Sequence, residues 1–391
     1  MVIDLPPAER IEPLNAPVIV SPGPRQASFG DVVALLDPAT THIVVTVNET
    51  AVLSRAVSGG RVELRVPLPQ RDVTIRVVAR RGSVDSAVAK VGPVYGLPRA
   101  GRPSSFQSAE DGRLARSVRT LALGFNGTAA VFVQDLRSGR GAAWNARARF
   151  PAASTLKLGI AIEVLRVLQS RPAPGSVLDR RMHRMIVYSS NRAANELLTW
   201  LGGSTSGGAA RVNATMRALS LYDSHMYGGY ILGTASTRPI PLRVESQPAF
   251  GIGKYTTAWD LARLHQQLHL GAVGKGRLVR LSSFTGADAR YLLYLLAHVR
   301  DPGKLNRFIE GPNVSVLHKS GWITKARHDS GLVYWTSGSF LAVVMTWNGG
   351  GVGTPSDVLA GRVAQAALRR FRELLGSPRY AISFKSRTAN A

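Results

Sequence analysis

Hydrophobic and polar residues alternate along several short segments in the first quarter of the chain. The clearest case is Val62, Leu64 and Val66, where every second residue is apolar. A period of two is typical of strands that bury one face, and turns rich in glycine, proline and serine separate the segments. The predicted strands lie in 17–20, 42–48, 60–68 and 72–81. We therefore predict a small all-β domain over 17–95, an immunoglobulin-like sandwich.

The pattern changes after residue 110 to longer helical spacings that are interrupted by a few strands. The last helix is the best marked, because Thr354 suits its N-cap, Pro355 its first turn, and Gly376 its end. The expected helices cover 110–123, 154–168, 178–201, 212–221, 255–270 and 354–376. A hairpin over 128–145 and late strands in 314–318 and 331–347 supply an antiparallel sheet. Helices that flank such a sheet predict an α+β domain over 110–376.

Three further segments complete the predicted organisation. The proline-rich residues 1–16 are expected to form a disordered leader, and 377–391 a loose tail. Residues 96–109 are rich in proline, glycine and serine and are expected to form a linker. A chain of 391 residues is long enough for the two domains that result. Because the sandwich carries no catalytic constellation, we expect it to be a spacer or a docking module.

Charge and composition narrow the possible partners. The 49 basic and 24 acidic residues give a formal net charge of +25, which favours anionic surroundings such as a cell-wall polymer or a membrane surface. The basic residues are scattered and not interleaved with stacking aromatics, so we do not expect nucleic-acid binding. No segment has the roughly 18 apolar residues of a membrane span. The start is no signal peptide, so either the chain is cytoplasmic or its export signal is missing from it.

The first candidate site is a serine followed three residues later by a lysine in an apolar stretch. Ser154 and Lys157 lie within 150–168, and on a helix this spacing places both side chains on one face. A buried lysine can lose its charge and become a base, which would activate the weak serine hydroxyl as a nucleophile. The alternative is an ordinary helix start, with the lysine extending to solvent along its stem.

Two later motifs supply polar groups of the kind that acyl transfer needs. Ser189 and Asn191 place a hydroxyl and an amide two residues apart at a helix start, where both residue types are also common as plain N-caps. Lys319, Ser320 and Gly321 follow His318 on an apolar strand. An inward lysine beside a hydroxyl, with a glycine that lets a substrate backbone approach, makes an anion-binding strand edge. An exposed lysine at a strand end is the simpler interpretation of this third motif alone.

The order S-x-x-K, S-x-N and K-[ST]-G resembles that of class A β-lactamases and penicillin-binding proteins. The resemblance covers about 110–376, and the segments 150–158, 189–198, 254–264 and 318–335 read like family text in the right order. It implies a β-lactamase/transpeptidase-like fold. It also implies a serine hydrolase that acts on β-lactam or peptidoglycan-like amides, without a cofactor, outside the cytoplasm.

The resemblance further implies a role for each matching residue. Ser154 would be acylated, Lys157 would be its base, and Ser189 would pass a proton to the leaving nitrogen. Asn191 would hold the substrate amide, while Lys319 and Ser320 would bind the substrate carboxylate and support Ser189. Gly321 and Trp322 would also belong to the substrate-binding residues. The backbone N–H groups of Ser154 and Trp322 would form the oxyanion hole.

The chain departs from the family pattern at three places, one of which is the stretch between Ser154 and Ser189, shorter than in typical class A enzymes. Ser190 stands where the second motif usually has aspartate, and the R-x-E-x-x-L-N pattern that carries the deacylating glutamate is incomplete. Glu245 keeps the R-x-E part and is the candidate general base. A solvated glutamate in a proline-rich loop is the alternative. If Glu245 is not the base, the acyl-enzyme would hydrolyse slowly, as in a penicillin-binding protein.

Other chemistries find no support in the sequence. The histidines lack metal-ligand spacing, cysteine is absent, and no phosphate-binding glycine loop is present, so we expect no metal site and no nucleotide. Three functions stay open. The first is a class A β-lactamase-type hydrolase, the second a cell-wall D,D-peptidase on the same fold, and the third a catalytically silent protein that binds an anionic cell-wall polymer.

Overall fold

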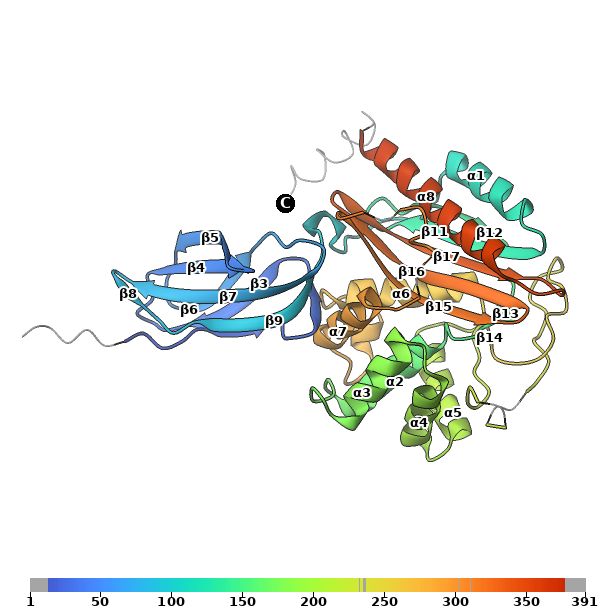
Figure 1. Ribbon diagram of the computed structural model, residues 1–391, viewed down its shortest axis with the longest axis horizontal. Coiled ribbons are helices and arrows are strands. Elements are labelled where there is room, and N and C mark those ends of the chain that lie inside the picture. Colours follow the sequence, from blue (N-terminus) through green and yellow to red (C-terminus); the bar gives the residue numbers. More distant parts are fainter. Residues whose placement is uncertain (1–12, 232, 235–236, 302, 310, 377–391) are drawn as a thin grey trace, which may run out of the picture. The chain divides into compact units, whose positions relative to one another are not determined.

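The chain forms two compact units, the first ending at Gly96 and the second beginning at Leu97. The computed structural model (Figure 1) describes residues 13–231, 233–234, 237–301, 303–309 and 311–376. The predicted tail and most of the predicted leader lie outside these ranges. Residues 13–16 of that leader are described, and Leu14 is buried in the core of the first unit.

The first unit consists of two sheets that share one apolar core. One sheet contains, in order, β1 (Val18–Ser21), β3 (Asp31–Leu36) and β6 (Gly60–Arg65). The other contains, in order, β2 (Gln26–Ser28), β9 (Ala89–Gly96), β7 (Asp72–Arg81), β4 (His42–Val47) and β5 (Thr50–Ala56), with β8 (Val84–Asp85) on β7. Ala34 and Leu64 of the first sheet join Ile43 and Ile75 of the second in that core. The all-β prediction is confirmed, and the strands that periodicity did not predict are β2, β3, β5, β8 and β9.

The second unit is built on a sheet whose three longest strands come late in the chain. Its order is β10 (Ala109–Glu110), β12 (Arg140–Trp144), β11 (Thr128–Asp135), β17 (Gly338–Trp347), β16 (Ala326–Trp335) and β15 (Val314–Ile323). Neighbouring strands are antiparallel except β10 and β12. A separate two-stranded sheet pairs β13 (Phe150–Pro151) with β14 (Tyr255–Thr256). The predicted hairpin and late strands are confirmed.

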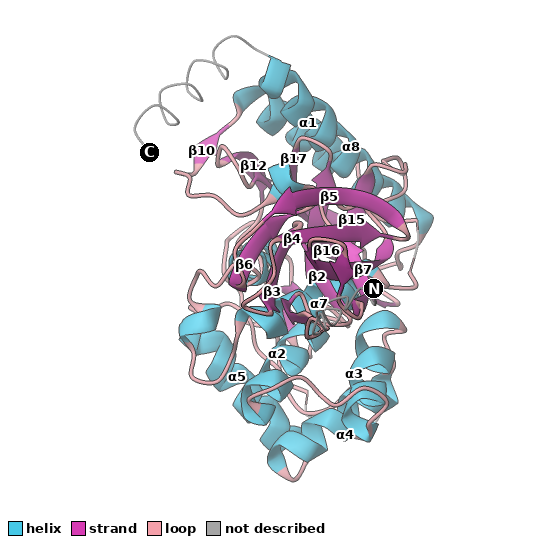
Figure 2. Cartoon of the chain, turned by 90° about the vertical axis from the view of Figure 1, so that its left-hand side faces the viewer, coloured by secondary structure: helices cyan, strands magenta, loops and turns pink. Residues whose placement is uncertain are grey.

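Helices cover both faces of this sheet. One group packs on one face and consists of α1 (Gly112–Leu123) and α8 (Thr354–Gly376). The other group lies on the opposite side and consists of α2 (Lys157–Leu168), α3 (Val177–Val187), α4 (Asn191–Gly202), α5 (Thr205–Ala218), α6 (Ala258–Gly271) and α7 (Gly286–Ala297). Figure 1 shows α6 and α7 on this side, and Figure 2 shows α2, α3, α4 and α5. Short 3₁₀ turns occur at η1 (Arg99–Gly101) and η2 (Leu278–Arg280). The α+β prediction is therefore confirmed.

Two local predictions are wrong, and one predicted segment has an unexpected contact. The expected helix over 178–201 is two helices, because the chain turns at 188–190 and Ser190 caps α4 by accepting a hydrogen bond from Ala193 N. The expected helix over 212–221 begins earlier, at Thr205, because the glycine- and serine-rich stretch after α4 is the start of α5, where the Ser204 hydroxyl accepts from Gly207 N. The expected linker is in part fixed to the second unit, since Gly101 is buried and its carbonyl accepts a hydrogen bond from Ser339.

Candidate active site

Ser154 lies in a tight turn immediately before α2, not on the helix itself. The amide of Lys157 donates to the Ser154 carbonyl over 3.2 Å, which is the spacing of a 3₁₀ turn. Ala153 has a φ of 47°, a conformation that non-glycine residues rarely adopt and that is often found at functional sites. The Ser154 side chain is partly exposed, and no described residue forms a hydrogen bond with its hydroxyl. The turn therefore presents the candidate nucleophile with its hydroxyl free.

The backbone of β15 passes directly beside this turn. A Cβ atom placed on Gly321 would lie 2.6 Å from the amide nitrogen of Ser154 and 2.9 Å from that of Thr155. Such distances are far shorter than any normal contact, so only glycine fits. The close approach of the nucleophile turn thus requires glycine at this position, and the predicted approach of a substrate backbone to Gly321 stays a prediction. Trp322, the next residue, is 63% exposed and its predicted oxyanion role stays a prediction.

The Lys157 side chain is fully buried and reaches the chain break between α3 and α4. Its Nζ donates to the Ser189 carbonyl over 2.5 Å and to Asn191 Oδ1 over 2.7 Å. Ser189 has a φ of 57°, and this left-handed conformation is rare for a residue other than glycine. The first two sequence motifs therefore meet at the Lys157 amine. The alternative in which this lysine extends to solvent is wrong.

The environment of Lys157 favours its neutral form. Burial, together with the positive charges of Lys319 and Lys254, lowers the pKa of Lys157 to about 6. A neutral amine has two N–H groups and one lone pair, and the Ser189 carbonyl and Asn191 take the two N–H groups. The lone pair is then left to accept a proton. Lys157 thus has the protonation state of a general base at neutral pH.

Lys157, Ser189 and Asn191 form a cluster of polar side chains. The third motif joins this cluster through a second buried lysine. Lys319 Nζ donates to Ser189 Oγ over 3.0 Å, and Lys157 Nζ lies 3.4 Å from the same oxygen. Burial lowers the pKa of Lys319 to about 8, although the carboxylates of Asp301 and Asp329 act in the opposite direction. Ser189 therefore lies between two lysine amines. A hydroxyl in this position can exchange a proton with either amine.

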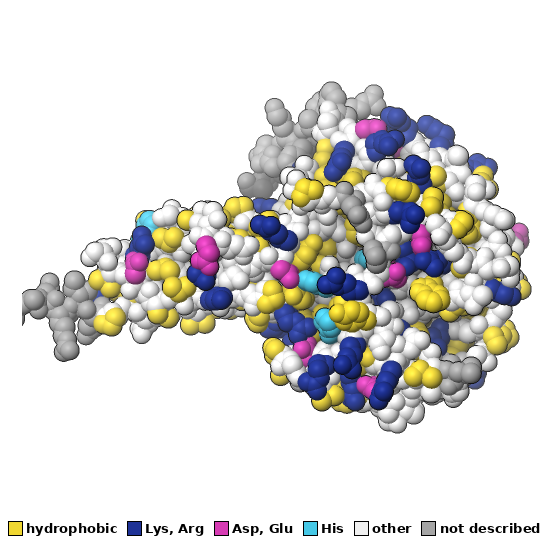
Figure 3. Space-filling view, viewed as in Figure 1, with side chains coloured by type: hydrophobic (Ala, Val, Ile, Leu, Met, Phe, Trp, Pro, Cys, Tyr) yellow, Lys and Arg dark blue, Asp and Glu magenta, His cyan; other side chains and the backbone are white. Residues whose placement is uncertain are grey.

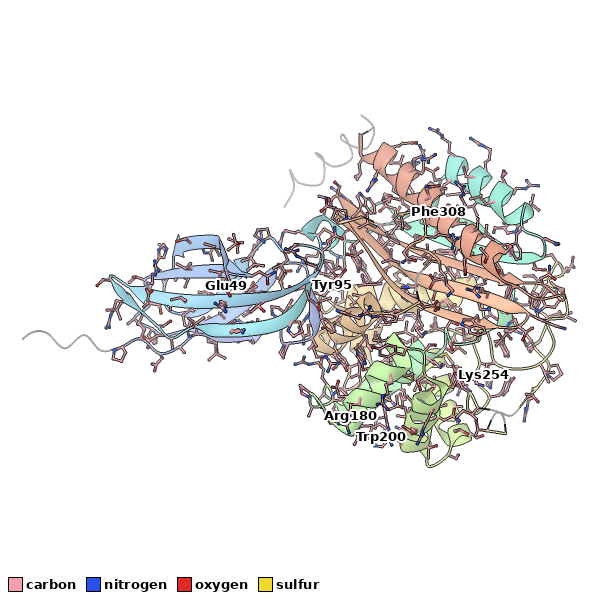
Figure 4. The ribbon with its side chains drawn as sticks, viewed as in Figure 1. Glu49, Tyr95, Arg180, Trp200, Lys254 and Phe308 are labelled. Atoms are coloured by element: carbon pink, nitrogen blue, oxygen red, sulfur yellow. The ribbon has the colours of Figure 1, made fainter. Side chains whose placement is uncertain are left out.

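Two further residues of the cluster have no place in the sequence prediction. Lys254 is labelled in Figure 4 and precedes β14, and its Nζ donates to the Gly229 carbonyl. The Tyr230 ring lies between two amines, with its centroid 4.6 Å from Lys254 Nζ and 4.8 Å from Lys157 Nζ. Burial lowers the pKa of Lys254 to about 8. The only signal in the sequence is that Lys254 opens one of the family-like segments, and Tyr230 stands in an irregular loop without any pattern.

Ser320 has an acidic neighbour that the sequence did not predict. Its hydroxyl donates to Asp301 Oδ2, and Lys304 Nζ donates to Asp301 Oδ1 over 2.5 Å. Both residues belong to the irregular connection between α7 and β15, which gives no periodic signal. A carboxylate thus occupies a position beside the strand that the resemblance assigns to binding the carboxylate of the substrate.

Glu245, the candidate deacylating base, is not part of the cluster. Its side chain is exposed and makes no hydrogen bond or ion pair with any described residue. Its neighbours fix this loop elsewhere, because Arg243 Nε donates to Asp223 over 3.1 Å and the Ser246 hydroxyl lies 3.4 Å from Asn145 Oδ1. The structure therefore gives the Glu245 carboxylate no contact with Ser154 or Lys157.

Two other kinds of site are not found in the described part of the chain. Its His, Asp and Glu side chains form no group of three or more that could hold a metal ion. None of its helices is both long enough and apolar enough to cross a membrane.

Comparisons with known proteins agree with this geometry. Residues 113–173 and 176–371 match the β-lactamase enzyme family. The structure of PBP-A has a TM-score of 0.54 and 18% identity, with 71% of this chain and 99% of that chain covered. A β-lactamase from Sphaerobacter thermophilus DSM 20745 has a TM-score of 0.51 and 21% identity, with coverages of 66% and 96%. A PBP-A mutant in an acyl-enzyme complex with penicillin G gives 0.51 and 18%, with coverages of 68% and 98%. No curated protein matches the sequence.

Proposed function

The chain belongs to the β-lactamase enzyme family and is a β-lactamase-like serine hydrolase, and from this premise we propose that it opens β-lactam or related cyclic or D-amino acid amides through an acyl-enzyme on Ser154. The proposal rests on Ser154, whose turn precedes the helix of Lys157 and lies against Gly321 of β15, and on the contacts that join Lys157, Ser189 and Lys319. These residues come from three parts of the chain, and acyl transfer needs the groups that they supply.

The reaction follows from the protonation states of these groups. Neutral Lys157 takes the proton of the Ser154 hydroxyl as its oxygen attacks the amide carbon. The backbone N–H groups of Ser154 and Trp322 stabilise the oxyanion, and removal of one such donor typically costs about 3–4 kcal/mol. When the C–N bond breaks, Ser189 gives its proton to the leaving nitrogen and regains one from the lysine amines. Water later releases the acid and restores Ser154.

The observation that carries this proposal is the state of Lys157. It is a fully buried amine with a pKa of about 6, and both of its N–H groups are taken by fixed oxygens. A lysine retained only for structure would be expected at the surface or beside a carboxylate. None of the Lys157 contacts in the described residues is with a carboxylate.

A second candidate function is that of a penicillin-binding enzyme with a long-lived acyl-enzyme. It is favoured by the exposure of Glu245 and by its lack of contact with the described residues of the cluster. Without a positioned base, water attacks the ester slowly. The two candidates share every step up to the acyl-enzyme and differ only in how fast it is hydrolysed.

The first unit and the surface charge support an extracytoplasmic role. We infer that the two-sheet unit is immunoglobulin-like and serves as a spacer or docking module. Figure 3 shows Lys and Arg side chains spread over this face of the second unit, with fewer Asp and Glu side chains among them. A surface of this kind attracts an anionic cell-wall polymer by long-range electrostatics. A catalytically silent wall-binding protein would keep these features and lose the acylation.

The test is a chromogenic cephalosporin assay on the wild-type chain and on Ser154→Ala, followed by mass spectrometry over time. We expect the wild type to form a covalent adduct and Ser154→Ala to form none. An adduct that disappears within seconds supports the hydrolase, and one that persists for many minutes supports the penicillin-binding function. The absence of both adduct and hydrolysis in the wild type would contradict the proposal and favour the silent binding protein.

A further inference from the structure

The substrate subsite at the edge of β15 contains an acidic side chain of the protein itself. Asp301 lies in the connection between α7 and β15, and its two carboxylate oxygens have different partners. Oδ2 accepts from the Ser320 hydroxyl, and Oδ1 accepts from Lys304 Nζ over 2.5 Å. The Lys304 side chain is only 2% exposed, so it holds the carboxylate from inside the protein. Asp301 is therefore fixed beside Ser320 from two directions.

The Asp301 carboxyl is ionised at neutral pH. Burial raises its pKa, but the hydrogen bonds from Lys304 and Ser320 and the charge of Lys304 outweigh this effect and bring the pKa below its ordinary value. An ionised carboxylate can only accept hydrogen bonds, so the single proton of the Ser320 hydroxyl must point at Asp301. Ser320 then offers lone pairs to a ligand and cannot donate to it.

Lys319 cannot replace the hydrogen-bond donor that a substrate carboxylate loses when Ser320 donates to Asp301. Its ammonium is fully buried and already donates to Ser189 Oγ and to the Ser320 carbonyl, each over 3.0 Å. At most one N–H group is left for a ligand. A substrate carboxylate bound here would meet one donor, the lone pairs of Ser320 and the negative charge of Asp301. A neutral group with N–H donors would instead match the acceptor that Ser320 presents.

We propose that Asp301 is a specificity-determining residue that makes this subsite select amide substrates with a neutral hydrogen-bond donor, such as a carboxamide, over those with a free carboxylate. This inference rests on the proposed function, because it concerns the same acylation of Ser154. It differs from what the sequence motif implies, since that motif assigns Lys319 and Ser320 to a substrate carboxylate.

The experiment compares acylation of Ser154 by penicillin G and by its carboxamide derivative, with rate constants measured by intact-protein mass spectrometry. The wild type should react faster with the carboxamide. In Asp301→Asn the side chain can still accept from Lys304 but carries no charge, which frees the Ser320 hydroxyl to donate. We expect the ratio of the acid rate to the carboxamide rate to rise by about tenfold or more. Glu110→Gln is the matched control, because it removes an exposed negative charge from the same unit.

An unchanged ratio in Asp301→Asn would overturn the inference, as would a wild type that prefers the acid. If Asp301→Asn does not fold, Asp301→Ser provides the second test, because it also removes the negative charge and frees the Ser320 hydroxyl to donate. Loss of this charge should remove the preference for the carboxamide, and a retained preference would contradict the inference. A wild type that is labelled by neither compound would refute the proposed function itself, which distinguishes the two failures.

Discussion

The two units differ in what they bury. Among the described residues of the first unit, the buried side chains are apolar or uncharged polar, and no Asp, Glu, Lys or Arg is buried. The described residues of the second unit include three buried lysines, Lys157, Lys304 and Lys319, and several buried carboxyl groups, among them those of Glu163 and Asp329. Burial of a charge is unfavourable unless a partner compensates it, and a buried lysine tends to lose its proton.

This difference shows which unit is built for chemistry. Glu163 has three partners, since Arg166, Arg211 and Thr215 all donate to it, so its burial is compensated as in a structural ion pair. Lys157 has only neutral partners and is held at a lowered pKa. A group kept buried without a counter-ion is a source of reactivity, and perturbed pKa values are concentrated at such sites. The first unit contains no described group of this kind.

The largest effect is expected from loss of the candidate base. Lys157→Met fills a similar volume but has no lone pair to accept the Ser154 proton. Because positioned general bases typically contribute about a hundredfold to ten-thousandfold, we expect acylation by penicillin G to slow by about a thousandfold. The measurement is the rate of adduct formation by mass spectrometry. Lys275→Met, at an exposed position, is the control. Equal rates in the two variants would remove Lys157 from the mechanism.

The next largest effect is a loss of stability of the first unit, which should leave the acylation of Ser154 unchanged. Ile75 is fully buried between its two sheets, and Ile75→Ala should lower the free energy of unfolding of this unit by about 2–5 kcal/mol. Denaturant titration measures this loss, with Val20→Ala at an exposed position as the control. Acylation of Ser154 should stay within about twofold of the wild type. A parallel loss of acylation would contradict the separation of roles between the units.

The rate of Ser154 acylation should have a bell-shaped dependence on pH. On each limb of the bell the rate should change about tenfold for each pH unit. Acylation should rise as pH passes about 6, since Lys157 must be neutral, and fall above about 8, where Lys319 loses its charge. In Lys254→Met one positive charge near Lys157 is absent, so the pKa of Lys157 should rise and the acid limb should move to higher pH. An acid limb that stays in place would show that Lys254 does not act on Lys157.

The smallest effect is expected at Glu245. Because its exposed side chain makes no hydrogen bond or ion pair with any described residue, Glu245→Gln should leave the lifetime of the acyl-enzyme unchanged within about twofold. The decay of a penicillin G adduct, followed by mass spectrometry, provides the measurement. A clearly longer lifetime in the variant would instead identify Glu245 as the deacylating base.

The sequence predicted elements best where a regular hydrophobic period was present. The strand over 72–81 alternates clearly, and α8 has a cap, a period and a stop signal. β9 was missed because it contains Gly92 and Pro93, which normally argue against a strand. These two residues lie where the register between β7 and β9 shifts, opposite Thr74, so they occupy an irregularity in the ladder. Local composition could not reveal that position.

The catalytic motifs were predictable and their surroundings were not. Ser154, Lys157, Ser189, Asn191 and Lys319 could be found because each belongs to a short pattern with fixed spacing. Tyr230, Lys254 and Asp301 come from irregular segments, and only the folded chain brings them to the other residues. The same limit applies to the choice of Glu245 as the candidate base, because a partial match to a loop pattern does not determine where the loop lies in the fold.

The central claim is that Ser154 is the residue that forms the acyl-enzyme. The most direct measurement is proteolysis and peptide mapping of the full chain after treatment with penicillin G. The account predicts one modified peptide, which contains Ser154, and no modification in Ser154→Ala. A modification on another residue, or an equal modification of the wild type and Ser154→Ala, would contradict it.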